Sequence, residues 1–152
     1  MFHLLTFIIL CFFISFPFVS PFFLFSPLAR NLLAKKQEAP PDDWRASLPR
    51  YSKENWEKNQ KLAGTVQELS EKYHCTAAQL SLAWLFHKAK ELGVTVVPIP
   101  GTTKIDNALS NFQSVNVTIS AEDSNILEGL ANQVAGERYE ESFMSASIEN
   151  QK

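Results

Sequence analysis

The run Val94–Pro100, with the sequence VTVVPIP, restricts the fold of this chain more than any other feature. Nearly every residue in it is apolar, whereas a strand with one face in water alternates apolar and polar residues. Such a run is typical of a strand that is buried on both faces, as in a parallel sheet. The sequence therefore predicts a short parallel strand here, with both of its faces covered.

Helical patterns precede this run. Apolar residues recur at steps of three and four over about Asn55 to Tyr73, which predicts an amphipathic helix. Thr76 is followed three residues later by Gln79, the capping-box arrangement that satisfies free amide groups at a helix start. The second helix is expected to end at Gly93, a residue suited to the left-handed end position.

Further helices are predicted after the strand. One covers Lys104 to about Phe112, and another begins at Ser120 with an acidic residue in its first turn. The tail after Gly136 shows no periodicity and is expected to be a surface loop. The repeated order of helix, strand, glycine turn and helix predicts a helix-rich α/β architecture.

Charge is distributed very unevenly along the chain. Residues 1–29 contain no Lys, Arg, Asp or Glu, so all 14 basic and 16 acidic residues lie from Arg30 onward. The net charge of −2 provides no electrostatic case for binding nucleic acid. The two cysteines, Cys11 and Cys75, form neither a disulfide framework nor a metal-ligand spacing.

The apolar run Leu4–Phe25 is long enough to span a bilayer, which requires ~20 apolar residues. The first basic residues, Arg30, Lys35 and Lys36, follow it, so an inserted segment would leave the rest of the chain in the cytosol. The run is also rich in Phe, Leu, Ser and Pro, whose codons consist largely of pyrimidines. Two interpretations therefore stay open: a membrane segment, or a mispredicted exon boundary.

The segment PIPGTTKIDNALSN has the strongest functional pattern. Gly101 allows the backbone to approach a ligand, and Thr102, Thr103 and Lys104 supply donors just before a helix. Helix starts present free amide groups and a positive dipole end, which suit phosphate. The same residues also fit a simple turn and helix cap, and the residues alone do not distinguish the two.

The order of several segments resembles the aldo-keto reductases, in the branch that contains plant and fungal NADP-dependent reductases and potassium-channel beta subunits. The matching segments are SPLAR, WRASLPRY, CTAAQLSLAWLF, VTVVPIPGTTKIDNALSN and GERYEES. The resemblance covers about Ser26 to the end and implies a (β/α)8 TIM barrel. It divides the chain into an apolar segment, residues 1–25, and the carboxyl-terminal part of a reductase domain, residues 26–152, with the last one or two barrel strands and their helices.

The resemblance also implies a cofactor, NADPH, and residues that bind it. Ser26 and Leu28 would contact the pyrophosphate, and two basic residues would lie near the nucleotide. The residues after the last strand would surround the ribose phosphate, and two asparagines would lie near the adenine. Ser110 departs from the family, in which a glutamate is usual at that position. The full set is Ser26, Leu28, Lys36, Arg45, Gly101, Thr102, Thr103, Lys104, Asn107 and Asn111.

The catalytic residues of the family, an Asp, a Tyr, a Lys and a His from the early barrel strands, have no counterpart in this sequence. Tyr51, Tyr73 and Tyr139 fall in regions that match non-catalytic parts of the family, so no catalytic residue is assigned. A complete barrel requires about 250 residues. The chain is therefore expected to carry part of an NADP pocket and to be inactive alone. Two alternatives are a membrane-anchored protein that binds partners through its helices, and a chain that joins a separate amino-terminal barrel half.

Overall fold

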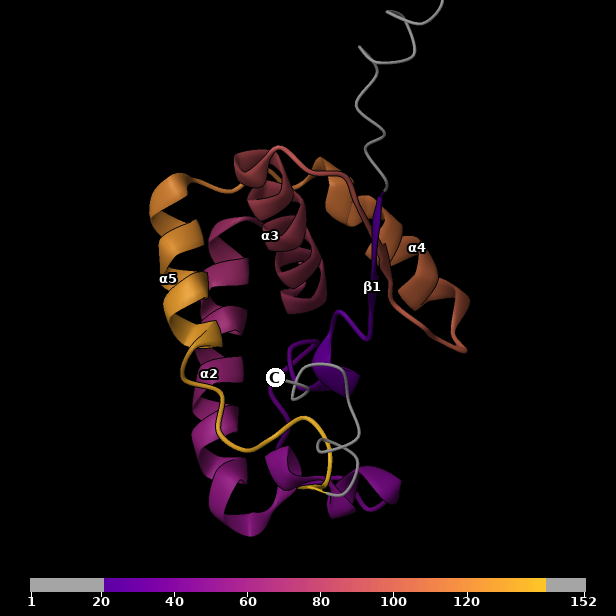
Figure 1. The fold of residues 1–152 in the computed structure, drawn as a ribbon, viewed down its shortest axis with the longest axis vertical. Helices are drawn as coiled ribbons and strands as arrows, with labels where there is room; N and C mark the ends of the chain where they lie inside the picture. The colour runs from indigo at the N-terminus through magenta and orange to yellow at the C-terminus, as the bar shows by residue number, and fades with distance from the viewer. Residues whose placement is uncertain (1–20, 142–152) are drawn as a thin grey trace, which may run out of the picture.

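Two strands that lie far apart in the sequence pair in parallel in the computed structural model, which describes residues 21–141 (Figure 1). Strand β1 is Phe22–Phe25 and strand β2 is Val96–Ile99, with Phe22 opposite Val96 in the register. The connection between them contains helices α2 (Lys53–Lys72) and α3 (Ala77–Leu92). After β2 come α4 (Ile105–Gln113) and α5 (Ala121–Ala131). The predicted parallel strand and helix-rich content are therefore confirmed, and they are compatible with part of an α/β fold.

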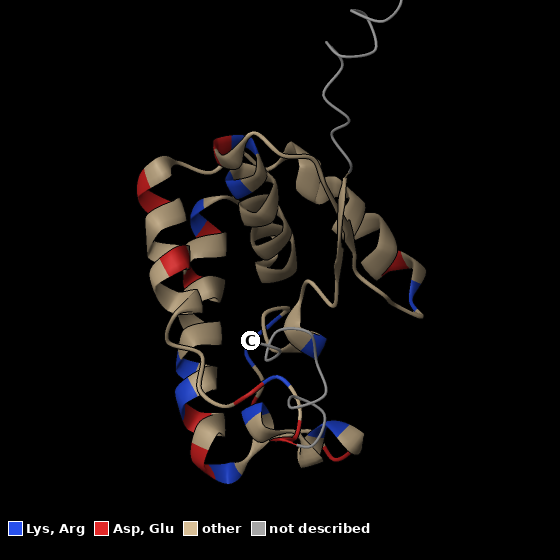
Figure 2. Cartoon of the chain, viewed as in Figure 1, with Lys and Arg blue, Asp and Glu red and all other residues tan. Residues whose placement is uncertain are grey.

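Helices α2, α3 and α5 lie side by side and enclose the main apolar core (Figure 1). Val66 of α2, Leu80 of α3 and Leu127 of α5 meet there, and Leu80 is completely buried. Burial of one such side chain contributes roughly 1.5–3 kcal/mol. Charged residues lie on the outer surfaces of α2 and α5, whereas α4 is uncharged beyond its first turn (Figure 2).

Helix α3 forms between the two signals that the sequence predicts. The Thr76 hydroxyl accepts a hydrogen bond from the Gln79 amide (3.1 Å), and the Gln79 side chain accepts one from the Thr76 amide (2.9 Å). Gly93 ends the helix with a φ of 66°, in the left-handed region that glycine adopts without steric cost. Both boundary predictions are confirmed.

Strand β2 is not buried on both faces, so that prediction was wrong. Its residues alternate, and the Val97 and Ile99 side chains are 37% and 50% exposed. The sheet contains only β1 and β2 among the described residues, and helix α3 packs against β2. The apolar run therefore forms the expected strand but lacks the neighbours that would cover its second face.

The apolar run Leu4–Phe25 is described only at its end, since residues 1–20 lie outside the described part. Phe22–Phe25 form strand β1. Within residues 21–141, no helix combines the length and the apolar character that crossing a membrane requires.

The chain after β1 forms an irregular strap, defined here as Ser26–Asn31. Four residues of the strap have positive φ values, which range from 48° to 82°: Ser26, Ala29, Arg30 and Asn31. Short 3-10 turns at Trp44–Ser47 and Pro49–Tyr51 then lead into α2.

The segment directly after α5, residues 132–136, is irregular and packs against the start of the body. The surface loop was predicted for the tail that follows Gly136, of which the structure describes only residues 137–141. The buried Asn59 side chain of α2 donates to the Ala135 carbonyl and accepts from the Ala135 amide, both at 2.9 Å. Gly136 has a φ of 85°, and a Cβ atom there would lie 2.8 Å from the Pro49 carbonyl oxygen. A glycine is therefore required at the point where this segment crosses the loop before α2.

Candidate functional site

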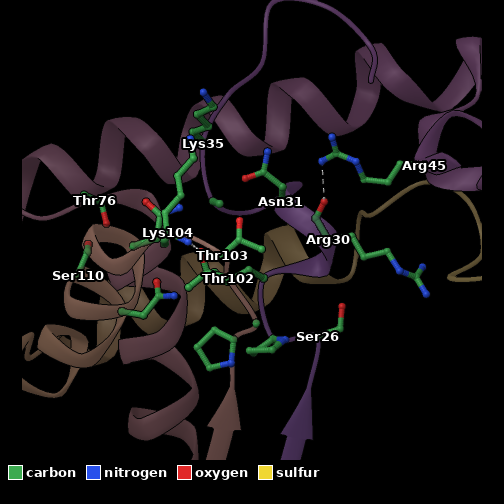
Figure 3. Close-up of a pocket in the computed structure, with 18 of the residues that line it drawn as sticks. Ser26, Arg30, Asn31, Lys35, Arg45, Thr76, Thr102, Thr103, Lys104 and Ser110 are labelled. Carbon is green, nitrogen blue, oxygen red and sulfur yellow. Dashed lines mark hydrogen bonds between the residues drawn. The ribbon is translucent and has the colours of Figure 1, made fainter. Parts of the chain in front are cut away.

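A cavity of about 1070 Å³ lies beyond the carboxyl ends of both strands. Figure 3 shows the strand arrows pointing toward its lining residues. Five parts of the chain form its wall: the strap, Ala34 with Lys35, the turn at Asp43–Arg45, the start of α3, and the loop from Pro100 into α4. In parallel α/β proteins, ligands bind at this end of the strands.

The structure brings together nine of the ten residues that the sequence assigned to a cofactor site. Lys36 is the exception, because its side chain extends along α2 instead. A Cβ atom on Gly64 would lie 3.6 Å from Lys36 Cδ, and the Lys36 amide donates to the Gln67 side chain (3.2 Å). The nine that line the cavity are Ser26, Leu28, Arg45, Gly101, Thr102, Thr103, Lys104, Asn107 and Asn111.

The cavity wall carries more positive than negative charge. Four cationic side chains line it, and Asp43 is the one carboxylate in the lining. Asp43 pairs with Arg45 at 2.9 Å, and no ion pair among the described residues includes Arg30, Lys35 or Lys104. The cavity therefore has three cations without a carboxylate partner, which favours an anionic ligand.

The ion pair between Asp43 and Arg45 fixes the orientation of the arginine. Arg45 Nε lies 2.9 Å and 3.1 Å from the two carboxylate oxygens, and Nη2 donates to Oδ2 at 2.9 Å. The hydrogen bond from Arg45 holds the pKa of Asp43 below its ordinary value, and the same contact raises the pKa of Arg45. Both groups therefore stay charged near neutral pH, and Arg45 keeps donors on its two Nη atoms for a ligand.

The carbonyl of Arg30 joins the strap to its surroundings. It accepts hydrogen bonds from the Tyr51 hydroxyl (2.8 Å) and from Arg45 Nη1 (3.3 Å), the latter drawn in Figure 3. Tyr51 is only 4% exposed, and burial raises the pKa of its phenol. Tyr51 therefore remains a hydrogen-bond donor, and it holds the strap in its positive-φ conformation.

The start of α4 forms the opposite wall of the cavity. Lys104 is its N-cap residue, and no side chain caps the amides of the first turn. Instead the Lys104 amide itself donates to the Thr102 hydroxyl (3.2 Å), while the side chains of Thr102, Thr103 and Lys104 are exposed. The uncapped amides and these side chains are hydrogen-bond donors at a helix start, an arrangement that suits an anion.

Sequence reasoning missed several lining residues. Lys35 lies in the cavity wall, and Thr76 contributes a hydroxyl group (Figure 3). Ser110, the position where the family usually has a glutamate, also lines the cavity. The neighbouring lysine, Lys36, was assigned in place of Lys35. Asp43 lies two residues before Arg45, a spacing that allows a local carboxylate–guanidinium pair and is a usable signal.

A Tyr, a Lys and an Asp do meet elsewhere in the structure. Tyr73 donates to the Asp123 carboxylate, which also accepts from Lys72 Nζ at 2.8 Å and from the Ser120 hydroxyl at 3.0 Å. None of these four residues lines the cavity. They connect the end of α2 to the start of α5, so their role is structural.

The fold and the cavity define a class of protein: an α/β protein with a cationic cavity at the carboxyl ends of parallel strands, where a glycine turn leads into a helix start. Residues 20–132 match the model of a family described as the Aldo/keto reductase family. The match covers more than half of the chain, so this protein belongs to the aldo/keto reductase family. Its members are oxidoreductases that usually use NAD(P)H. The family resemblance is thus confirmed, with the match beginning upstream of Ser26.

Proposed function

We propose that this chain is the nucleotide-binding, carboxyl-terminal part of an aldo-keto reductase and binds NADPH in the cationic cavity. The observation that carries the proposal is the group of cations without a carboxylate partner among the described residues, Arg30, Lys35 and Lys104, at the carboxyl ends of two parallel strands. The Arg30 guanidinium also donates to the Arg138 carbonyl (3.0 Å), which leaves Lys35 and Lys104 as the cations most available to a ligand. NADPH carries several phosphate charges, which such a group attracts. In this proposal, β1 and β2 are the last two strands of a (β/α)8 barrel.

The residues present fit the cofactor in both charge and donor type. The uncapped start of α4, with Thr102, Thr103 and Lys104, would hold the ribose phosphate. The strap and Arg45 would hold the pyrophosphate, and Asn107 and Asn111 would lie toward the adenine. A volume of about 1070 Å³ reaches the upper end of the range for ligand cavities, which accommodates a large ligand.

We also propose that residues 1–152 do not reduce carbonyl compounds by themselves. Bound NADPH supplies a hydride, but a carbonyl oxygen also needs a proton donor beside the acceptor carbon. The hydroxyls of Tyr51 and Tyr73 are engaged with the strap carbonyls and with Asp123, and neither residue lines the cavity. The remaining barrel strands, from further sequence or from a partner, would supply the proton donor.

The nucleotide proposal is tested by titrating the purified chain with NADPH and NADH while following ligand fluorescence. We expect NADPH to bind more tightly, because its additional phosphate meets Lys104 and the start of α4. Lys104→Gln should weaken NADPH binding about fivefold to tenfold, the effect of losing one exposed charge-assisted contact. It should change NADH binding much less.

Lys90→Gln is the matched control, since Lys90 is an exposed lysine on α3 outside the cavity. Saturable NADPH binding that Lys104→Gln leaves unchanged would contradict the assigned site, and no binding at millimolar NADPH would contradict the function. Turnover of a carbonyl substrate above a matched blank would contradict the proposed inactivity.

A further inference from the structure

A second cavity, of about 230 Å³, lies among helices α2, α3 and α5, away from the cationic cavity. Its wall is mainly apolar, with Leu62 and Val66 from α2, Leu85 from α3 and Leu130 from α5. A cavity of about 150 Å³ accommodates a benzene ring. The larger volume here therefore suits an alkyl chain of about eight carbons.

Two polar side chains contribute to this wall. The Ser81 hydroxyl lies 2.8 Å from the Ala77 carbonyl and 3.1 Å from the Leu33 carbonyl, so its proton is already engaged. Arg50 is the one charged residue in the lining. The cavity thus combines an apolar body with a single cation.

Arg50 forms no ion pair with a carboxylate among residues 21–141. Its Nε donates to the Gly136 carbonyl (3.2 Å), and its side chain is half-buried. It also borders a small gap whose lining includes Arg30 and Arg138, and no ion pair among the described residues includes any of these three arginines.

Burial, followed by the charges of Arg138 and Arg30, lowers the pKa of Arg50, and Glu137 only partly opposes them. A half-buried cation beside like charges is an unfavourable arrangement in the absence of an anion.

We propose that this second cavity binds a small amphipathic carboxylate of the medium-chain fatty acid class. The alkyl chain would lie between the helices, and the carboxylate would accept hydrogen bonds from the Arg50 guanidinium. Charge complementarity selects this ligand, because an uncharged apolar molecule would fill the cavity but leave Arg50, the charged residue of its wall, without an anionic partner. The inference does not depend on NADPH binding, since the two cavities have only Pro27 in common.

The test compares octanoate with 1-octanol, which has the same alkyl chain but no charge, by calorimetric titration into the full chain. We expect octanoate to bind with one-to-one stoichiometry and at least tenfold more tightly than octanol. The difference should shrink as salt is raised, because the carboxylate contact is electrostatic. This comparison requires no variant and is independent of any effect of mutation on folding.

Arg50→Gln should remove the preference for octanoate and bring the two affinities together. Lys61→Gln, an exposed charge change on α2, is the matched control and should leave the preference intact. Equal affinities for octanoate and octanol, or no binding of either, would overturn the proposal. Displacement of octanoate by NADPH in direct competition would also overturn it, because it would place the anion in the other cavity.

Discussion

Ala29 lies in the left-handed region with a φ of 48°, and its neighbours Arg30 and Asn31 have φ values of 56° and 82°. Alanine gains nothing from this conformation, because its Cβ atom crowds the following carbonyl oxygen at a cost of roughly 1–2 kcal/mol. The Tyr51 hydroxyl and the Arg45 guanidinium hold the strap in place by donating hydrogen bonds to the Arg30 carbonyl. Arg30 and Asn31 line the proposed nucleotide cavity, so the strain at Ala29 lies directly beside its wall, as is common at ligand sites.

Ala29→Gly is expected to stabilise the protein by about 0.5–1 kcal/mol. Glycine relieves the left-handed strain, and its additional flexibility in the unfolded chain offsets part of that gain. Urea unfolding followed by circular dichroism measures the change. Ala46→Gly, at a residue without positive φ, should lower stability instead. A loss of stability in Ala29→Gly would show that the strap is not strained.

Single residues were predictable where the local pattern decides their position. Thr102, Thr103 and Lys104 follow a strand and precede a helix, so their place at the cavity follows from neighbours in the sequence. Lys35 and Lys36 lie in irregular chain, where no period indicates which side chain faces inward. Only the packing of Lys36 against α2 decides between them.

At the scale of elements, helix boundaries were more predictable than burial. Thr76, Gln79 and Gly93 act within one turn of chain, so the sequence contains the whole signal for α3. Ser120 caps α5 in the same local way. The exposure of β2 was not predictable, since it depends on which strands and helices lie beside it.

The contact of Asp123 at the start of α5 with Lys72 and Tyr73 at the end of α2 should make the stability of the fold depend on pH. Asp123 is 2% exposed, and its pKa is lowered by the hydrogen bonds from Lys72 and Tyr73. Because the pKa of Asp123 is lower in the folded chain than in the unfolded chain, the ionised carboxylate stabilises the fold. This stabilisation is complete above the unfolded value of 3.8, and it is lost as the pH falls through the lower value of the folded chain.

We therefore expect the urea midpoint to fall as the pH is lowered from about 5 toward 3. Asp123→Asn should be less stable at pH 7 and should show a flatter decline over this range. Glu122→Gln, an exposed neighbour, is the control and should keep the wild-type slope. Equal slopes for Asp123→Asn and the wild type would exclude this contact as the source of the pH dependence.

At the scale of the whole molecule, apolar surface remains uncovered on one side. Helix α4 has no buried residue, and its Ile105, Leu109 and Phe112 side chains are 79%, 59% and 75% exposed. The helix carries no charge beyond its first turn (Figure 2). Contiguous apolar surface of this kind promotes association.

The double variant Leu109→Gln, Phe112→Gln should reduce concentration-dependent association, as measured by light scattering. Its free energy of unfolding should change by less than about 0.5 kcal/mol, because neither side chain is packed. Val66→Ala, in the core, should lower stability by about 1 kcal/mol or more without reducing association. Unchanged scattering in the double variant would assign the association to another surface.

Arg138, near the end of the described chain, contacts the first strand directly. Arg138 donates to the Phe25 carbonyl at 3.2 Å and stacks 4.1 Å above the Phe25 ring. A truncation that removes Arg138 would therefore take both contacts from the first strand, so a loss of order in β1 can originate 113 residues away in the sequence.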